Sequence, residues 1–412
     1  MTRVAGALIL VLLVAGCGGR RGVAVTVAPN TSRWDQAIDV RVTGLHPGRS
    51  VVVAMRAVDA NGVAFSSSAP FRADRHGVVD LARMAPIRRA GQPDYDMVWP
   101  MGLFASMKPT AGGLEPFYWT PGPQLFHVAV SASGRTLTTT TFRRGFGYPT
   151  PIVDRQLTAA REGIVGTYAA PRHAGRGPAV LAFGGSEGGP GPSLDAVRFA
   201  SDGIPTLALG YFDAPGLPRD LEDIPLEYFR RALQWLDRQP GVDPKQVTVI
   251  GTSRGGEAAL LLGVHYPALV HGVVSLVGSD YVVCGIARLG ATGCIGPSWT
   301  IDGKPLPYIG TGVPNPAARI PVARIHGPVL LSCADEDQVW GSCGYASEAE
   351  HELNAAHFPY RHPLYAYANT GHFGAQIGPY EPGELLRDTF VPYDERARES
   401  LWPKILAFVR RV

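Results

Sequence analysis

The chain has 412 residues, which is more than one ordinary domain usually contains. Its hydrophobic residues make up 45% of the sequence and suffice for two cores, so we expect two folded domains. Its 38 Lys and Arg residues nearly balance 35 Asp and Glu residues. The net charge of +3 leaves no strongly basic stripe, which excludes nucleic acid as the expected partner. The 50 glycines and 36 prolines follow no repeat, which indicates many turns and excludes a collagen-like chain.

The first residues have the pattern of an export signal. Arg3 supplies the positive start, and residues 4–14 form an apolar run that is too short to span a bilayer. The run ends in Val14-Ala15-Gly16-Cys17, which resembles the bacterial lipobox, a site cut before a Cys that receives lipid. We expect a signal peptide over residues 1–16, a lipidated linker over residues 17–22 and a mature chain anchored through Cys17 to the outer face of a membrane. An ordinary secretory signal with an incidental Cys is the alternative.

Residues 23–146 are expected to form an all-β, immunoglobulin-like sandwich. Apolar and polar residues alternate in short runs, as half-buried antiparallel strands require. Turn signals such as His46-Pro47-Gly48 and Asn61-Gly62 separate the runs. We find no catalytic constellation in this part of the sequence. The clearest strands are expected over residues 23–27, 38–42 and 126–130.

Residues 151–412 follow a boundary rich in Gly and Pro and are expected to form an α/β-hydrolase domain with a mostly parallel sheet. Fully apolar strands alternate there with amphipathic helices, which is typical of a sheet covered on both faces. The clearest helix is expected over residues 225–239, where apolar residues recur at helical spacing, and a final helix from about residue 398 to 409. The strands are expected over residues 179–183, 205–209, 247–250, 273–277 and 328–332.

Ser253 is the expected nucleophile. It is the central residue of Gly251-Thr252-Ser253-Arg254-Gly255, between an apolar strand and a helix, which is the context of the nucleophile elbow in α/β-hydrolases. Glycine two residues before and two residues after the Ser allows the sharp turn without a clash. A Gly-rich turn that only packs a helix against the sheet is the alternative.

Two backbone N–H groups are expected to form the oxyanion hole. One belongs to Arg254, the first residue after the nucleophile, and the other should come from the loop after the strand over residues 179–183. That loop is Gly184-Gly185-Ser186-Glu187-Gly188-Gly189, and we expect Gly185 or Ser186 to supply the donor. A phosphate-binding loop is the alternative, but the segment lacks the P-loop lysine and the GxGxxG pattern.

The catalytic acid and base are expected later in the chain, in the order that this fold uses. The strand over residues 328–332 leads into a segment with three carboxylates, and we favour Asp337 because it lies a few residues beyond the strand end, with Asp335 as the alternative. His372 lies in a loop between glycines. We expect Asp337 to orient His372, and His372 to take the proton of Ser253 before an acyl-enzyme forms.

Four cysteines remain when Cys17 is assigned to lipid attachment. They form two close pairs, and an oxidising compartment favours a disulfide within each, Cys284 with Cys294 and Cys333 with Cys343. The second disulfide would clamp the loop that carries the acid. Other pairings remain open. Zinc is a weaker interpretation because the spacing is not CxxC, and we expect neither a metal nor a cofactor.

Five segments match a known family. They are Trp99-Pro100-Met101-Gly102-Leu103-Phe104, Gly210-Tyr211-Phe212, residues 223–229, residues 251–257 and Gly371-His372-Phe373. On these segments the chain resembles the acyl-CoA thioesterase and bile acid-CoA:amino acid N-acyltransferase family over nearly all of its mature length. The resemblance implies a β-sandwich packed on a dienelactone-hydrolase-like domain that acts on activated acyl thioesters. It points to Ser253, Asp337 and His372, and it favours Asp337 because this residue precedes Trp340 as the family acid precedes its Trp.

The chain departs from this family at two points. The conjugating acyltransferases use Cys where this chain has Ser253, so the resemblance implies hydrolysis rather than conjugation. The expected lipid anchor faces outward, whereas acyl-CoA is cytosolic. We therefore expect a membrane-anchored hydrolase of acyl thioesters or lipid-like esters. The alternatives are an acyltransferase that moves an acyl group to an envelope glycan, lipid or amine, and a non-catalytic envelope binding protein.

Overall fold

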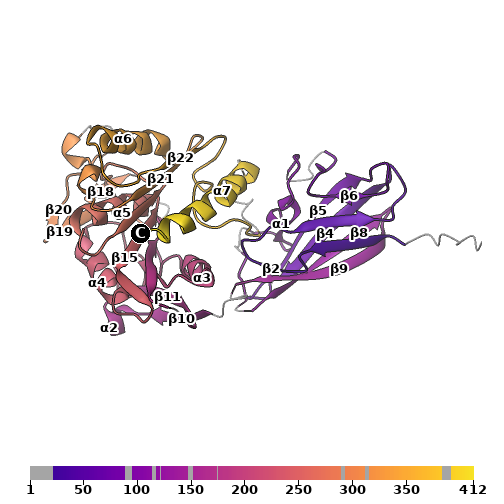
Figure 1. The fold of residues 1–412 in the computed structure, drawn as a ribbon, viewed down its shortest axis with the longest axis horizontal. Coiled ribbons are helices and arrows are strands. Elements are labelled where there is room, and N and C mark those ends of the chain that lie inside the picture. Colours follow the sequence, from indigo (N-terminus) through magenta and orange to yellow (C-terminus); the bar gives the residue numbers. More distant parts are fainter. Residues whose placement is uncertain are drawn as a thin grey trace, which may run out of the picture.

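The computed structural model shows a β-rich lobe and an α/β lobe joined at one end (Figure 1). It describes residues 22–88, 95–113, 117–120, 122–146, 152–173, 175–288, 293–310, 315–382 and 391–412. The expected signal peptide and Cys17 lie outside these residues. Within them, no helix is both long enough and apolar enough to cross a lipid bilayer.

The β-rich lobe is a sandwich of two sheets. Its strands alternate between buried and exposed residues as the sequence predicts, so that Phe126, Val128 and Val130 are buried while Leu125 and His127 face outward. One sheet has the order β1 (Ala24–Ala28), β3 (Asp39–Thr43), β6 (Val79–Asp80). The other has the order β2 (Thr31–Arg33), β9 (Arg135–Gly145), β8 (Gln124–Ala132), β4 (Ser50–Val58), β5 (Ala64–Arg72), β7 (Lys108–Pro109).

The short helix α1 (Gly102–Ala105) completes the core of the sandwich. It overlaps the end of the Trp-Pro-Met-Gly-Leu-Phe segment, in which Trp99, Met101, Leu103 and Phe104 are all buried. A Cβ on Gly102 would overlap the ring of Tyr95, so the glycine of this segment is required by a close approach. The segment is therefore structural.

The α/β lobe is built on one sheet of eight strands. The central strands are parallel and buried on both faces, whereas the β10–β11 and β11–β13 pairs are antiparallel. The mostly parallel sheet expected from the sequence is confirmed. The order is β10 (Ile152–Leu157), β11 (Val165–Pro171), β13 (Thr206–Gly210), β12 (Gly177–Phe183), β15 (Val242–Thr252), β16 (Gly272–Leu276), β21 (Val329–Ala334), β22 (Leu364–Tyr367).

Helices cover both faces of this sheet. On one face α4 (Leu226–Leu236), α5 (Arg254–His265) and α6 (Ser342–Ala355) share a core with the alternate residues of the strands. On the other face α3 (Ser193–Ser201) and α7 (Val391–Val409) pack against the remaining strand residues. Helix α7 begins earlier than about residue 398, the expected start, because its first turns bury Asp394 and Glu395, which break the apolar pattern.

Shorter elements connect the main ones. Most of them fall between β16 and β21, a part of the chain without a periodic apolar pattern. They are α2 (Ala159–Glu162), β14 (Ile224–Pro225), β17 (Gly285–Ile286), β18 (Cys294–Gly296), β19 (Trp299–Ile301), β20 (Lys304–Pro305) and the 3₁₀ turns η1 (Pro316–Ala318) and η2 (Val322–Arg324).

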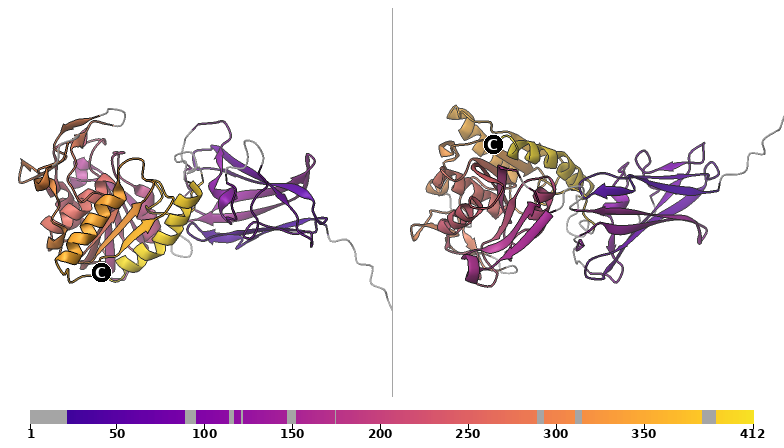
Figure 2. Two further views of the ribbon diagram at one scale, coloured as in Figure 1. Left: turned by 90° about the horizontal axis from the view of Figure 1, so that it is seen from above. Right: turned by 60° about the horizontal axis from the view of Figure 1, so that its bottom comes forward.

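The two lobes meet at Trp34. Its indole N–H donates to Ser201 Oγ at 2.9 Å, and its ring packs edge-on against Trp402 of α7. Beside it, the Arg33 guanidinium forms an ion pair with Asp202 at 2.6 Å. In both views of Figure 2 the yellow helix α7 reaches from the α/β lobe to the near end of the sandwich. The lobes are therefore joined by specific side-chain contacts through α7 and α3.

Candidate active site

Ser253 lies at the turn between β15 and α5. Its backbone has φ +56° and ψ −119°, a strained conformation for a residue with a side chain, and its N–H donates to Leu276 O at 2.8 Å. A Cβ on Gly251 would overlap the Gly255 backbone, and a Cβ on Gly255 would overlap Gly184 O. The two flanking glycines are thus required by close approach, as the elbow motif predicts.

Asp337 and His372 are hydrogen-bonded to each other. His372 Nδ1 lies 2.8 Å from Asp337 Oδ2, and the two side chains are 7% and 2% exposed. The other oxygen of Asp337 accepts the N–H groups of Val339 and Trp340 at 2.9 and 3.1 Å. Burial opposes ionisation of Asp337, but the bonds from His372 and Ser342 outweigh it and leave the pKa of this carboxyl below its ordinary value.

The alternative acid, Asp335, has a different environment. It is exposed, and its Oδ1 accepts the N–H of Thr370 at 3.3 Å. Ser253 and His372 are both nearly buried, at 7% and 6% exposure, but no hydrogen bond joins them in the part of the chain that the structure describes. The structure thus places His372 in hydrogen-bond contact with Asp337, whereas the described residues show no hydrogen bond between His372 and Ser253.

Helix α7 packs against the loop that carries His372. Asp394 Oδ1 accepts the N–H of Gly371 at 2.8 Å, and a Cβ on Gly374 would overlap Asp394. On the other side of the base, Gln376 Nε2 donates to the carbonyl of His372 at 2.7 Å. Sequence reasoning missed Asp394 and Gln376, because a polar residue that supports a loop from another element leaves no motif.

The expected oxyanion loop lies directly against Ser253. A Cβ placed on Gly185 would be 2.9 Å from Ser253 Cβ, so only glycine fits there. The N–H of Gly185 donates to Glu187 Oε2 at 2.8 Å. Arg254 is the first residue of α5, where the N–H groups have no partner within the helix. Ser186 is half-buried in the same loop.

Glu187 was not singled out by the sequence. Its side chain is exposed by surface area, yet protein atoms crowd the carboxylate. Burial raises the pKa of Glu187 above its ordinary value, although the Gly185 N–H and the charge of His372 act in the opposite direction. A carboxylate therefore lies beside the expected nucleophile and base.

A buried ion pair ties the nucleophile helix to the segment after β16. Arg254 Nε lies 3.2 Å from Glu257 Oε2, and its two terminal nitrogens donate to Val283 O at 2.7 Å and Cys284 O at 3.0 Å. Glu257 also accepts the indole N–H of Trp299. Burial raises the pKa of Glu257 to about 7 against the opposing charge of Arg254. The Arg254 side chain thus fixes the start of α5 while its N–H stays near Ser253.

Both close cysteine pairs are joined in the structure. Disulfides link Cys284 to Cys294 and Cys333 to Cys343. The second runs from the end of β21 to the start of α6 and encloses the loop of Asp337. Over the described ranges, no group of His, Cys, Asp and Glu residues could hold a metal ion.

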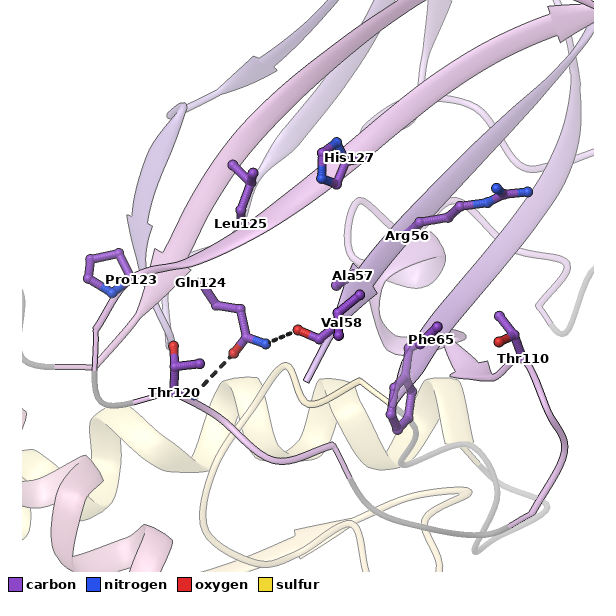
Figure 3. Close-up of a pocket in the computed structure, with 11 residues that line it drawn as sticks. Arg56, Ala57, Val58, Phe65, Thr110, Thr120, Pro123, Gln124, Leu125 and His127 are labelled. Atoms are coloured by element: carbon purple, nitrogen blue, oxygen red, sulfur yellow. Dashed lines mark hydrogen bonds between the residues drawn. The ribbon is translucent and has the colours of Figure 1, made fainter. Parts of the chain in front are cut away.

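A groove lies on the outer face of the sandwich (Figure 3). Arg56 and His127, which pair across β4 and β8, are at one side, and the exposed side chains of Val58 and Leu125 are at the other. Gln124 donates to Val58 O and accepts from the N–H of Thr120. The groove contains none of the expected catalytic residues, so the candidate active site is the one at Ser253.

Two sequence models of one family match the chain. The acyl-CoA thioester hydrolase/BAAT N-terminal region matches residues 35–155, and the BAAT/acyl-CoA thioester hydrolase C-terminal model matches residues 224–295 and 310–411. The chain belongs to the acyl-CoA thioester hydrolase/BAAT family. As a member of this family it is a thioester hydrolase.

Relatives of this acyl-CoA thioester hydrolase/BAAT protein align with 82% to 92% of its length. Acyl-coenzyme A thioesterase 6 of Mus musculus is 28% identical over 410 residues, covering 92% of this chain and 94% of its own. The peroxisomal succinyl-coenzyme A thioesterase of Mus musculus is 28% identical over 367 residues, covering 83% of each chain. Acyl-coenzyme A thioesterase 1 of Homo sapiens is 28% identical over 360 residues, covering 82% of each.

Solved structures are also similar to this family member. A putative dienelactone hydrolase from Klebsiella pneumoniae has a TM-score of 0.44 at 17% identity and covers 63% of this chain and 99% of its own. A puromycin-hydrolyzing peptidase of Mycobacterium tuberculosis has a TM-score of 0.44 at 16% identity and covers 95% of this chain and 68% of its own.

One family segment supports the oxyanion loop. The Tyr211 hydroxyl, within Gly-Tyr-Phe, donates to Gly185 O and to Gly184 O. Tyr228, from the next family segment, donates its hydroxyl to Gly210 O at 2.7 Å and accepts the N–H of Val165 at 2.9 Å. Tyr211 thus holds the loop beside Ser253, whereas Tyr228 binds the backbone at the end of β13 and the start of β11.

Proposed function

We propose that the chain hydrolyses acyl thioesters through an acyl-enzyme on Ser253, with His372 as the base and Asp337 as its orienting acid. The observation that carries this proposal is the Asp337–His372 hydrogen bond at 2.8 Å between two nearly buried side chains. A base whose Nδ1 is held by a carboxylate has its Nε2 free to accept a proton. The strained elbow at Ser253 supports the same assignment.

The steps follow the general chemistry of acyl transfer. His372 Nε2 removes the proton of Ser253 Oγ as Oγ attacks the thioester carbonyl carbon, and the N–H groups of Arg254 and Gly185 stabilise the oxyanion. The C–S bond then breaks and His372 returns the proton to the leaving thiolate. Water then loses a proton to His372 and attacks the acyl carbonyl carbon. The bond from that carbon to Ser253 Oγ breaks, His372 returns the proton to Oγ, and the carboxylic acid leaves. Ser253 in place of Cys favours water over an amine as the acceptor.

Exposed apolar residues next to the triad support an acyl substrate. Val339 follows Asp337 by two residues and is 59% exposed, and Phe373 follows His372 and is 39% exposed. Solvent exposure of apolar side chains beside a reaction centre is typical of a surface that binds an apolar ligand. Neutral acyl chains are therefore the substrate class that we expect.

We also propose that the protein faces outward, attached through lipid on Cys17. The support is the order of Arg3, the apolar run over residues 4–14 and the lipobox-like residues before Cys17. Two acyl chains on one Cys would suffice for stable attachment. Replacement of Cys17 by Ala should release the protein from the membrane fraction, and retention there would contradict the proposal.

The deciding experiment uses the chain without residues 1–17. We expect hydrolysis of acyl-CoA thioesters or p-nitrophenyl esters, labelling by a fluorophosphonate probe, and a loss of at least about 10³-fold in kcat/KM for Ser253→Ala. Ser347→Ala, on the exposed face of α6, is the matched control and should retain full activity. Absence of hydrolysis on every acyl donor, or equal activity in Ser253→Ala, would refute the proposal.

A further inference from the structure

Glu187 folds back over the loop that follows β12. Its Oε2 accepts the N–H of Gly185 at 2.8 Å, and a Cβ on Gly184 would overlap its Oε1. Because Gly184 has no side chain, the Glu187 carboxylate can lie directly against the backbone of residues 184 and 185. The carboxylate satisfies a donor that the proposed mechanism requires for the substrate.

The same donor lies between Glu187 and the nucleophile. A Cβ built on Gly185 would be 2.9 Å from Ser253 Cβ and 3.2 Å from Glu187 Oε2. Both groups are thus in contact range of one point beside Gly185. An acyl carbonyl that reaches Ser253 and the Gly185 N–H together must enter the space that the carboxylate holds.

We propose that Glu187 is a specificity-determining residue whose carboxylate occupies the Gly185 N–H in the free protein, so that an uncharged acyl group displaces it more readily than an acyl group that carries its own carboxylate. This inference rests on the proposed function of Ser253 and Gly185. A second negative charge near Glu187 meets like-charge repulsion, which an alkyl chain of equal length avoids.

The charges around Glu187 strengthen this discrimination. Asp195 of α3, which forms an ion pair with Arg198 at 2.7 Å, adds a negative charge near the carboxylate. The Tyr211 hydroxyl donates to the Gly184 and Gly185 carbonyls instead. A carboxylate on the substrate would therefore add to the negative charge already present around Glu187.

The test compares butyryl and succinyl thioesters of one thiol, which have the same number of acyl carbons and differ by a terminal carboxylate. Wild-type protein should prefer butyryl. Glu187→Gln should raise kcat/KM for succinyl by about tenfold and change it much less for butyryl, since a repulsion between charges is removed. Butyrate, a product whose carboxylate can take the same N–H, should also inhibit Glu187→Ala about tenfold more strongly than wild type.

Glu350→Gln, half-exposed on α6, is the matched control and should change neither quantity. Glu187→Ala is needed beside Glu187→Gln because a Gln oxygen can still accept the Gly185 N–H. An unchanged succinyl-to-butyryl ratio in both variants, or a parallel loss of both activities with intact folding, overturns the inference and leaves hydrolysis by Ser253 standing. Failure of wild type and both variants on every thioester overturns this inference and the proposed function together.

Discussion

At the residue scale, one hydrogen bond decides which nitrogen of His372 can react. Nδ1 is held by Asp337, so Nε2 is the atom that can accept the Ser253 proton. Asp335 lies only two residues away, yet it bonds to the backbone of Thr370. The hydrogen bond to His372 supports the proposal that Asp337, rather than Asp335, is the acid.

Replacement of Asp337 by Asn tests that choice. Asn preserves the shape but removes the charge that fixes the imidazole, so we expect kcat to fall by about 10³- to 10⁴-fold. Asp335→Asn is the matched control and should retain activity within about threefold, because an exposed bond to a backbone N–H contributes little. Steady-state hydrolysis of one thioester by both variants is the measurement. A larger loss in Asp335→Asn would reverse the assignment.

Some residues of the candidate site could be predicted from the sequence and others could not. Ser253 follows from the spacing of Gly251 and Gly255, and His372 follows from chain order and its glycine-flanked loop. Glu257 and Asp394 were missed because their roles depend on contacts with residues far away in the chain, and Glu187 was missed because a carboxylate that folds back on its own loop has no sequence motif. Charged residues are expected on the surface, so no pattern indicates that Glu257 is fully buried.

At the scale of elements, the loop between β21 and α6 is closed covalently. Cys333 and Cys343 lie ten residues apart with Asp337 between them. Strands and helices with regular apolar spacing were recognisable from sequence, as α4 and the central strands show. The segment between β16 and β21 was not, because its short strands are stabilised by the Cys284–Cys294 disulfide and by contacts to Arg254 rather than by periodic burial.

Removal of the Cys333–Cys343 disulfide should affect catalysis as well as stability. In the chain-entropy account, a closed loop of this size stabilises a fold by about 2 to 3 kcal/mol. We expect Cys333→Ala/Cys343→Ala to lose roughly that much and to show a kcat reduced about tenfold, since small displacements of a catalytic group are costly. Cys284→Ala/Cys294→Ala is the control, because it removes a disulfide that closes a loop of equal length. Equal losses of kcat in both variants would show that the clamp on Asp337 has no special role.

At the scale of the whole molecule, buried acids set the pH dependence of stability. Burial raises the pKa of Glu257 to about 7 and that of Asp280 to about 7, the latter against the opposing charge of Arg319. In the unfolded chain both carboxyls have pKa values of about 4. Between these limits the folded state binds more protons than the unfolded state, so the free energy of unfolding decreases as pH rises.

We therefore expect the protein to unfold at a higher temperature at pH 5 than at pH 7.5. The contribution of Glu257 to this difference is at most about 3 kcal/mol. Glu257→Gln removes its titration and should flatten the dependence, even though it leaves Arg254 without its anion and lowers stability overall. Thermal unfolding of both proteins across this pH range is the measurement. An unchanged slope in the variant would mean that Glu257 is already ionised at pH 5.

Helix α7 connects the loop of His372 to the sandwich. The helix supports Gly371 through Asp394, and farther along it presents Trp402 to Trp34 and Glu399 to the indole N–H of Trp99. The loop of His372, the proposed base, is thus supported by a helix that also contacts the other lobe. Ser253, Asp337 and His372 all come from one lobe, but the helix that supports the loop of His372 is itself packed against the other lobe. A change at Trp34 or Trp99 can therefore reach this loop through α7.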